Sequence, residues 1–255
     1  MTAAVTTASR PKLLVSGIDV AYGAVRAVHG ASLELGAGIT ALVGANGAGK
    51  SSLVKAIAGL EPCGGTIALD DGRDVTRLPS HRRVRDLGIV LVPEGRGVLP
   101  RMSVAENLEL GLRVGRARDA EADAEERLLE LFPQLRARYR TSARYLSGGE
   151  QQMLSMARAL AMKPAYLLVD EPSLGLSPAT VTALFTSIRS VVAEQEIALL
   201  LIEQDTRAAL ELADHAYVME RGRIALEGAS EELAAGPLLR AAYLGARSGT
   251  EAGVA

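Results

Sequence analysis

The stretch GANGAGKS, from Gly44 to Ser51, lies between ITALV, which is typical of a short strand, and SSLVKAIAGL, which has the apolar spacing of a helix. Glycines let the backbone turn tightly and aim N–H groups at an anion, and a following helix presents its positive end to the same point. A glycine-rich loop that joins strand to helix and ends in lysine and serine predicts a phosphate-binding loop. A chance glycine-rich turn is disfavoured by these flanking elements. We therefore expect an α/β core around this loop.

The loop also predicts how a nucleoside triphosphate is held. Lys50 is expected to reach the β- and γ-phosphates, and the Ser51 hydroxyl to bind Mg²⁺. Backbone N–H groups of the loop are expected to surround the phosphate oxygens. The residues assigned to nucleotide binding here are Gly44, Ala45, Asn46, Gly47, Ala48, Gly49, Lys50, Ser51 and Ser52.

A second chemical signal is YLLVDEP, where an apolar run of strand length ends in Asp170 and Glu171. Alone, such a pair indicates no more than a solvated strand end. Beside a phosphate loop it indicates more, because hydrolysis needs an anchor for the metal and a group that positions water. We expect Asp170 to hold Mg²⁺, through water, and Glu171 to orient or deprotonate the attacking water.

A third stretch, LSGGEQQ from Leu146 to Gln152, has the form of another anion site. It offers a serine and two glycines, followed by a run of helix-forming residues. It has no lysine of its own, although one chain of this size should need one nucleotide. By itself the motif is ambiguous, since glycines before a helix are common at turns.

Composition excludes several classes of protein. The chain has 255 residues, 48% hydrophobic and 23% charged, which fits a soluble globular protein with a full core. A net charge of −2 gives no case for nucleic-acid binding, where a basic footprint is expected, and the basic run HRRVRD is interpreted as a solvated face. One cysteine, Cys63, excludes a disulfide framework and fits a reducing compartment. No run reaches the roughly 18 apolar residues of a membrane span.

The remaining pattern predicts an α/β core interrupted by a helical block. The block runs from about Arg101 to Met162, and SVAENLEL within it begins with Ser103 as N-cap and Glu106 at the capping-box position. We expect a single domain over residues 12–245. Its nucleotide-binding core would comprise 12–94 and 163–245, its helical subdomain about 95–162, and its flexible tails 1–11 and 246–255.

Together, the three motifs resemble those of the ATP-binding subunits of ABC transporters, over about residues 12–245, and LSGGEQQ is specific to that superfamily. The resemblance implies a P-loop NTPase core, a mixed sheet flanked by helices with an antiparallel β subdomain, plus the inserted helical subdomain. It also implies that two such chains meet head to tail. Ser147, Gly148 and Gly149 would then bind the ATP held by the partner's lysine loop, which explains a phosphate motif without a lysine.

Further positions carry over from the family. Tyr22, upstream of the glycine loop, stands where an aromatic stacks on adenine, although an aromatic on a strand can equally be a core residue. The SLGL segment, 173–176, occupies the loop that contacts the partner subunit. The family usually ends this loop with Asp, and Leu176 lacks that polar side chain.

Two departures point to one branch of the family. Glu94 replaces the usual glutamine, a Mg²⁺ ligand and relay to the membrane subunit, and a carboxylate can bind Mg²⁺ as a charged ligand. Gln204 replaces the usual histidine at the γ-phosphate, and its amide can donate a hydrogen bond but cannot become a cation. These substitutions, with PSLGLSP and the final AYLG, are similar to the second ATPase subunit of branched-chain amino acid importers. That subunit commonly pairs with a sister ATPase, which implies a heterodimer, with a homodimer as the alternative.

The resemblance implies an ATP hydrolase at the cytoplasmic face of the cell membrane. It would use ATP and Mg²⁺, act on transmembrane permease subunits, and serve a substrate-binding protein indirectly. The expected catalytic residues are Glu171, Gln204 and Lys50, and the expected metal ligands are Ser51, Glu94 and Asp170. Residues 95–102 are expected to line the groove that receives a helix of the membrane subunit.

Other functions stay open. An importer of urea, amides or other small organics, or a lipid exporter, would share these motifs because the ATPase never touches the cargo. A soluble ABC ATPase of DNA repair or translation would carry a long coiled coil or a second ATPase unit, and this chain has neither. A non-hydrolysing, ATP-gated interaction protein would not need Glu171.

Overall fold

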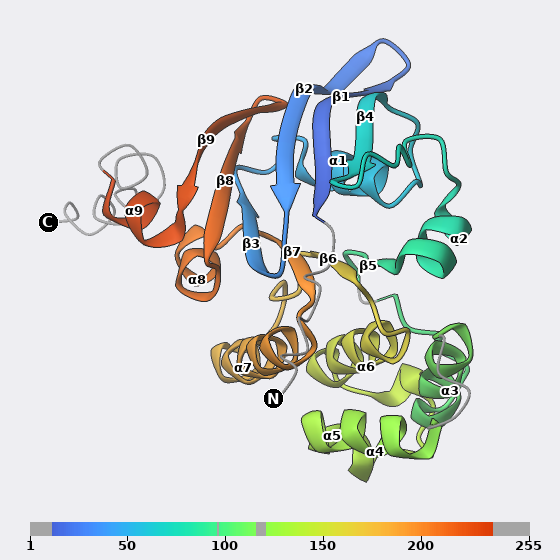
Figure 1. The fold of residues 1–255 in the computed structure, drawn as a ribbon. Coiled ribbons are helices and arrows are strands. Elements are labelled where there is room, and N and C mark those ends of the chain that lie inside the picture. Colours follow the sequence, from blue (N-terminus) through green and yellow to red (C-terminus); the bar gives the residue numbers. More distant parts are fainter. Residues whose placement is uncertain (1–11, 96, 116–120, 237–255) are drawn as a thin grey trace, which may run out of the picture.

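The computed structural model describes residues 12–95, 97–115 and 121–236 (Figure 1). The tails expected at 1–11 and 246–255 lie outside the described residues. Two sheets and the helices around them make up the described fold, and the phosphate loop and the YLLVDEP motif follow strands of the larger sheet.

The larger sheet has six strands in the order β5-β6-β7-β3-β8-β9. All neighbours pair in parallel except β9, which forms an antiparallel hairpin with β8. The strands are β3 (Gly38–Val43), β5 (Ile89–Val92), β6 (Tyr166–Asp170), β7 (Ala198–Glu203), β8 (His215–Glu220) and β9 (Arg223–Ala229). Every residue of β6 and β7 is buried, which explains their continuous apolar sequence. The strand order places β3, β6 and β7 together, so the segments that follow them meet at one edge.

The smaller sheet is antiparallel, in the order β2-β1-β4, with strands β1 (Leu13–Tyr22), β2 (Val25–Leu35) and β4 (Gly64–Leu69). Helix α1 (Lys50–Ile57) packs between the two sheets, because its buried residues share one core with both of them. Leu53 and Ile57 of α1 contribute to this core, as do Leu42 of β3 and Leu200 of β7. The helix that begins at the phosphate loop is therefore held on two sides.

Most of the helices cover the opposite face of the larger sheet. In Figure 1, α3 to α6 gather below the strands, with α7 beside them. Alternate residues of β7, such as Leu199 and Leu201, join their core. The helices are α2 (Ser80–Arg82), α3 (Val104–Val114), α4 (Glu121–Leu131), α5 (Pro133–Ala137), α6 (Gly148–Ala161), α7 (Pro178–Gln195), α8 (Thr206–Leu212) and α9 (Ser230–Ala235). The α/β architecture with an antiparallel β subdomain and additional helices is the one that the sequence predicts.

The capping box expected at the start of the helical block is confirmed. The Ser103 hydroxyl accepts a hydrogen bond from the Glu106 N–H, and the Glu106 carboxylate accepts one from the Ser103 N–H at 2.7 Å. Two N–H groups at the start of α3 are thereby satisfied.

The interpretation of HRRVRD as a solvated face is wrong for Arg83. Its side chain is 2% exposed, and its guanidinium donates to the carbonyls of Ala56 and Ile57 at the end of α1 and to those of Thr76 and Leu78. Arginine carries five N–H donors in a planar fork, which suits such a set of carbonyls. The run therefore anchors a π-helical turn, Arg83–Leu87, to the end of the phosphate-loop helix.

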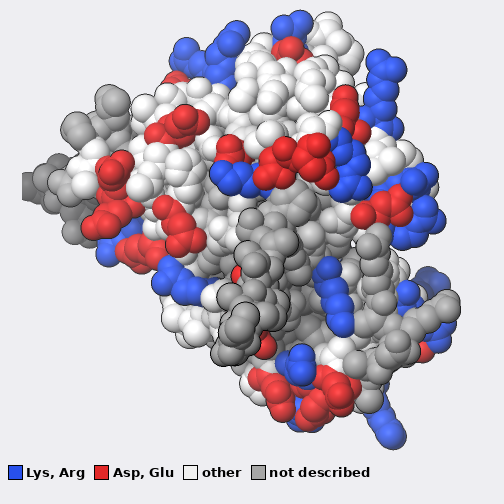
Figure 2. Space-filling model, viewed as in Figure 1, with Lys and Arg blue, Asp and Glu red and all other residues white. Residues whose placement is uncertain are grey.

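The surface shown in Figure 2 carries basic and acidic side chains side by side, with neither sign forming a continuous field on that face. Within the part of the chain that the structure describes, no helix combines the length and apolar character that crossing a bilayer requires.

Candidate functional site

Two glycines let the phosphate loop approach neighbouring backbone closely. Gly44 has φ 156° and Gly49 has φ 104°. A Cβ atom on Gly44 would lie 2.2 Å from the Met219 carbonyl oxygen, and one on Gly49 would lie 2.4 Å from the Ala27 carbonyl oxygen. Any larger residue would push the loop away from β8 and β2, so the loop's shape depends on these two positions.

Lys50 is held within the loop by hydrogen bonds to the loop backbone. Its side chain is 4% exposed, and its Nζ donates to the carbonyl oxygens of Gly44 at 2.7 Å and Ala45 at 3.2 Å. It also lies 3.9 Å from the Glu171 carboxylate. A buried ammonium with two neutral carbonyls and one distant carboxylate is positioned to receive an anion.

A pocket of about 330 Å³ opens over this loop. It is lined by Tyr22, Ala27, Asn46, Gly47, Ala48, Gly49, Lys50, Ser51, Ser52 and Glu171. Tyr22 is 44% exposed, so it is not the core residue that a strand aromatic often is. Gly49 caps α1 without any side-chain hydrogen bond, which leaves the first N–H groups of the helix available to phosphate oxygens.

Ser51 and Asp170 lie together at the base of the site. The Ser51 Oγ donates to the Asp170 Oδ1 at 3.2 Å, and Asp170 is 3% exposed. Burial raises the pKa of Asp170; the Ser51 hydrogen bond opposes this effect, and the carboxylates of Glu171 and Glu94 add to it. A carboxylate disfavoured by burial and by neighbouring negative charge is one that a cation would stabilise in its ionised form.

The oxygens of Ser51 and Asp170 fit Mg²⁺, which also takes ligands from phosphate and water, better than they fit a metal that needs all its ligands from the protein. Among the described residues, no three His, Cys, Asp or Glu side chains cluster closely enough to hold a metal. Mg²⁺ is usually bound by one or two protein oxygens together with phosphate oxygens and water. Ser51 and Asp170 supply two such oxygens, whereas Glu94, an exposed residue just after β5, acts on Asp170 through its charge.

Glu171 and Gln204 meet directly. The Gln204 Nε2 donates to the Glu171 Oε2 at 2.5 Å, so the structure joins the two residues that the sequence places 33 positions apart. Glu171 has φ 49°, a left-handed conformation that is uncommon for a residue with a side chain. Its N–H donates to the Ile202 carbonyl of β7 at 2.9 Å. The loop after β6 is thus fastened to the end of β7.

The LSGGEQQ segment begins helix α6, and Ser147, Gly148 and Gly149 do not line the pocket at the phosphate loop. Ser147 caps the helix by accepting a hydrogen bond from the Glu150 N–H, and Glu150 accepts one in return from the Ser147 N–H. The chain therefore does not present this motif to the nucleotide pocket that its own lysine loop forms.

Large apolar side chains are exposed next to these motifs. Tyr145, two residues before Ser147, is 70% exposed, and Leu174, in the SLGL segment, is 53% exposed. Leu176 is only partly exposed and packs against the core of the helical side. Exposed aromatic and aliphatic residues beside a functional motif are a feature of contact surfaces.

One residue of the site was missed from the sequence. Glu203, the last residue of β7, is 1% exposed and accepts hydrogen bonds from Ser173 and from the Gln204 N–H. Burial raises the pKa of Glu203, and these hydrogen bonds act against the increase. The only signal in the sequence is a carboxylate at the end of a fully apolar strand, directly before a predicted catalytic residue.

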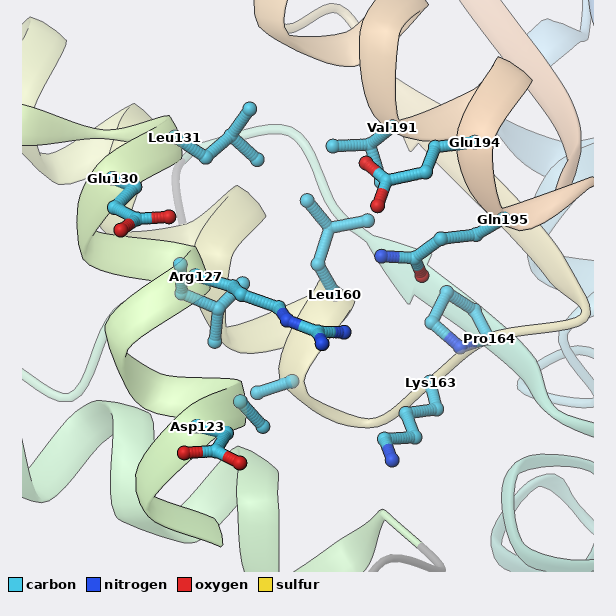
Figure 3. Close-up of a pocket in the computed structure, with 13 residues that line it drawn as sticks. Asp123, Arg127, Glu130, Leu131, Leu160, Lys163, Pro164, Val191, Glu194 and Gln195 are labelled. Atoms are coloured by element: carbon cyan, nitrogen blue, oxygen red, sulfur yellow. The ribbon is translucent and has the colours of Figure 1, made fainter. Parts of the chain in front are cut away.

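A larger cleft, of about 810 Å³, lies elsewhere, between α4, the end of α6 and α7 (Figure 3). Arg127 and Lys163 extend toward it, together with Glu194 and Gln195. None of the predicted site residues lines it. The residues of the phosphate loop, together with Tyr22 and Glu171, line the smaller pocket instead.

Comparison with known proteins gives the family. The protein-family model described as "ABC transporter" matches residues 28–174. The chain is 42% identical, over 229 residues, to the high-affinity branched-chain amino acid transport ATP-binding protein BraG of Pseudomonas aeruginosa, covering 89% of this chain and 97% of that protein. It is 39% identical, over 195 residues, to the probable branched-chain amino acid transport ATP-binding protein LivF of Archaeoglobus fulgidus, covering 76% of this chain and 82% of that protein.

The fold agrees with this result. An ATP-binding cassette of an ABC transporter, solved in its ADP conformation, matches with a TM-score of 0.77 and 27% identity, covering 93% of this chain and 100% of that one. This likeness confirms the predicted fold class. Since the family model covers more than half of the sequence and both relatives exceed 30% identity over most of their lengths, the chain belongs to the ABC transporter family as an ATP-binding protein.

Proposed function

We propose that this ABC transporter ATPase energises a membrane importer for branched-chain amino acids. The proposal for the transported substrate rests on the 42% identity to BraG, which extends over 97% of that protein. The glutamate–glutamine pair at positions 171 and 204, beside a complete phosphate loop, supports hydrolysis rather than ATP-gated binding alone. The chain would act at the cytoplasmic face of the cell membrane.

In this proposal ATP occupies the 330 Å³ pocket. Adenine stacks on Tyr22, the phosphates lie along residues 44–52, and Lys50 turns from the loop carbonyls to the β- and γ-phosphates. Ser51 and Asp170 would hold Mg²⁺, with Glu94 as a further ligand. The ion would supply positive charge against the phosphate oxygens.

Hydrolysis then depends on positioning and charge rather than on covalent catalysis. A water oxygen bonds to the γ-phosphorus as the bond from that phosphorus to the β–γ bridging oxygen breaks. Glu171 orients this water and can accept its proton. Gln204 would hold the Glu171 carboxylate through the 2.5 Å hydrogen bond and would sense the γ-phosphate. Lys50 and the loop N–H groups offset the charge on the departing ADP.

A second ATPase subunit completes the site. Ser147, Gly148 and Gly149, away from the chain's own pocket, would close over ATP bound to the partner, and the partner's equivalent segment would close over this chain's ATP. The exposed Tyr145 and Leu174 would be covered in that contact. We infer a sister ATPase as the partner, with transmembrane permease subunits and, through them, a substrate-binding protein. We also retain residues 95–162 as a helical subdomain within the domain at 12–245.

The permease is proposed to dock in an apolar groove of about 700 Å³. This groove differs from the one expected at residues 95–102, because none of the described residues in that range lines it. Its lining comes from the end of α1, the turn that Arg83 anchors, β5 and the end of α3. The contributing residues are Ala58, Leu60, Ser80, His81, Val84, Arg85, Ile89, Val90, Leu91, Pro93, Arg113, Val114 and Met162. Leu60 and Val114 are 56% and 48% exposed, as anchors for an inserted apolar helix would be.

Charging this groove should separate assembly from hydrolysis. Val114→Glu is expected to abolish co-purification with the permease, because it would place a carboxylate against an apolar helix. ATP binding by the variant should match the wild type, since Val114 is not part of the nucleotide pocket. Ala193→Glu, an equivalent change on the exposed part of α7, serves as the control. If Val114→Glu still co-purifies with the permease, the docking site does not lie in this groove.

The proposed function as a whole is tested by ATP turnover. Phosphate release and oligomeric state would be measured for the purified chain alone and after mixing with its sister ATPase. We expect turnover to appear or to increase strongly on mixing, because each site needs a motif from the other chain. If the chain alone forms a dimer, and its turnover is the same with and without the sister ATPase, the working assembly is a homodimer and not a heterodimer. Failure to bind or hydrolyse ATP in either state would contradict the proposal.

A further inference from the structure

The end of β7 carries a carboxylate with an unusual set of partners. The Glu203 Oε1 accepts the Ser173 N–H at 3.0 Å, and its Oε2 accepts the Ser173 Oγ at 2.8 Å and the Gln204 N–H at 3.2 Å. At 1% exposure the group is cut off from water. Within the described part of the chain, no basic side chain forms an ion pair with it. A buried carboxylate without a countercharge is costly, so these three hydrogen bonds are what make its presence tolerable.

The same strand end holds Glu171 at two other points. The Glu171 N–H donates to the Ile202 carbonyl at 2.9 Å, and the Glu171 carboxylate accepts from Gln204 at 2.5 Å. Ser173 lies two residues after Glu171, on the same loop. Three consecutive residues at the end of β7, Ile202, Glu203 and Gln204, therefore hydrogen-bond to the loop that follows β6.

This loop contains a strained residue. Glu171 has φ 49°, a left-handed conformation that residues with a Cβ adopt at a cost and keep only where surrounding contacts enforce it. The Ile202 carbonyl fixes the Glu171 N–H on one side. On the other side the loop is held by the two hydrogen bonds from Ser173 to the Glu203 carboxylate. Loss of these two hydrogen bonds would allow the loop to relax and the Glu171 carboxylate to shift.

We propose that Glu203 is a positioning residue for ATP hydrolysis, which keeps Glu171 aimed at the γ-phosphate by fixing Ser173 and Gln204 together. The inference rests on the proposed function, in which Glu171 orients the attacking water. ATP binding lies outside this arrangement, because Glu203 does not line the nucleotide pocket. The residue therefore acts on turnover and leaves nucleotide affinity unchanged, which separates positioning from a general contribution to the fold.

Four variants test this inference. Glu203→Met removes both acceptor oxygens, and with them all three hydrogen bonds, at similar volume and without leaving a buried charge. Glu203→Gln preserves two of the three hydrogen bonds, because its amide oxygen can accept the Ser173 N–H and its amide N–H can donate to the Ser173 Oγ. Ser173→Ala removes the hydroxyl from the other side. Thr206→Val is the matched control, since Thr206 is also buried, three residues along the chain, and its hydroxyl has no partner within the described residues.

The measurements are phosphate release at saturating ATP, ATP affinity, and amide hydrogen exchange at Ser173 and Gln204. For Glu203→Met we expect turnover to fall by about 10- to 100-fold, the scale on which a misplaced catalytic group acts, with ATP affinity within twofold of the wild type. Exchange at the two amides should accelerate. The turnover of Glu203→Gln should lie between that of Glu203→Met and that of the wild type. Adding Ser173→Ala to Glu203→Met should cause no further loss, because both changes break the same link.

Different outcomes separate this inference from the proposed function. Wild-type turnover in Glu203→Met would overturn the inference alone, as would parallel losses of turnover and ATP affinity. If Glu203→Met does not fold, Glu203→Gln decides by the same criteria, with loss of turnover at unchanged affinity as the supporting result. A wild-type chain that never hydrolyses ATP would overturn the proposed function and, with it, the catalytic part of the inference.

Discussion

Replacing Glu171 with glutamine is expected to lower ATP turnover by about 100- to 1000-fold, the range in which loss of a general base or positioning group falls. The amide keeps the size of the carboxylate and can still accept the hydrogen bond from Gln204. It cannot accept a proton from water, and it orients water less strongly than a carboxylate does. ATP affinity should remain within twofold or increase, because the 3.9 Å contact between Lys50 and the Glu171 carboxylate loses its charge and frees the lysine for the phosphates.

The same variant should accumulate in a closed, ATP-bound dimer, because ATP joins the two subunits and hydrolysis releases them. Phosphate release and size-exclusion chromatography in the presence of MgATP would follow both effects. Glu196→Gln is a close control, since Glu196 is exposed, lies at the end of α7 and shares the left-handed φ of Glu171, at 51°. Full residual turnover in Glu171→Gln would refute the water-positioning role.

Much of the site was predictable because its chemistry is local in the sequence. The phosphate loop occupies consecutive residues between a strand and a helix, and the close approaches at Gly44 and Gly49 explain the glycines there. Asp170 could be located because it ends an apolar strand, and the structure brings it to Ser51. Pairing of Glu171 with Gln204 follows from two adjacent parallel strands ending at one edge. The catalytic and metal-binding roles of these residues stay predictions.

Other features were not predictable because they depend on distant contacts. Glu203 resembles a solvated strand end in the sequence, but it is buried in the fold, and its hydrogen-bond partner Ser173 lies 30 residues earlier. Arg83 lies in a basic run that looks exposed, and two of its four carbonyl partners, Ile57 and Ala56 at the end of α1, are 26 and 27 residues away. The groove proposed for docking combines segments from the end of α1 to the end of α6, which are far apart in the sequence, and its role stays a proposal. The use of Ser147 by a partner depends on a second chain and stays a proposal.

Replacing Lys50 with alanine is expected to weaken ATP binding by about 10- to 100-fold, since a hydrogen bond to a charged group contributes about 1.5–3 kcal/mol. No other lysine or arginine lines the nucleotide pocket, so nothing in the described lining can take its place. Turnover at saturating ATP should fall as well, because the lysine also offsets charge at the γ-phosphate. Titration calorimetry with MgATP would measure the affinity.

The nucleotide-free variant should unfold within about 3 °C of the wild type, because a change of less than 1 kcal/mol shifts the midpoint of a chain of this size by only a few degrees. The carbonyls of Gly44 and Ala45 that Lys50 leaves behind lie on a loop bordering the open pocket, where water can satisfy them. ATP raises the unfolding temperature only as far as it binds the folded chain, so that increase should largely vanish in Lys50→Ala. Lys55→Ala, an exposed change on the same helix, should retain it. An undiminished ATP-dependent increase in Lys50→Ala would show that the phosphates bind somewhere other than the glycine loop.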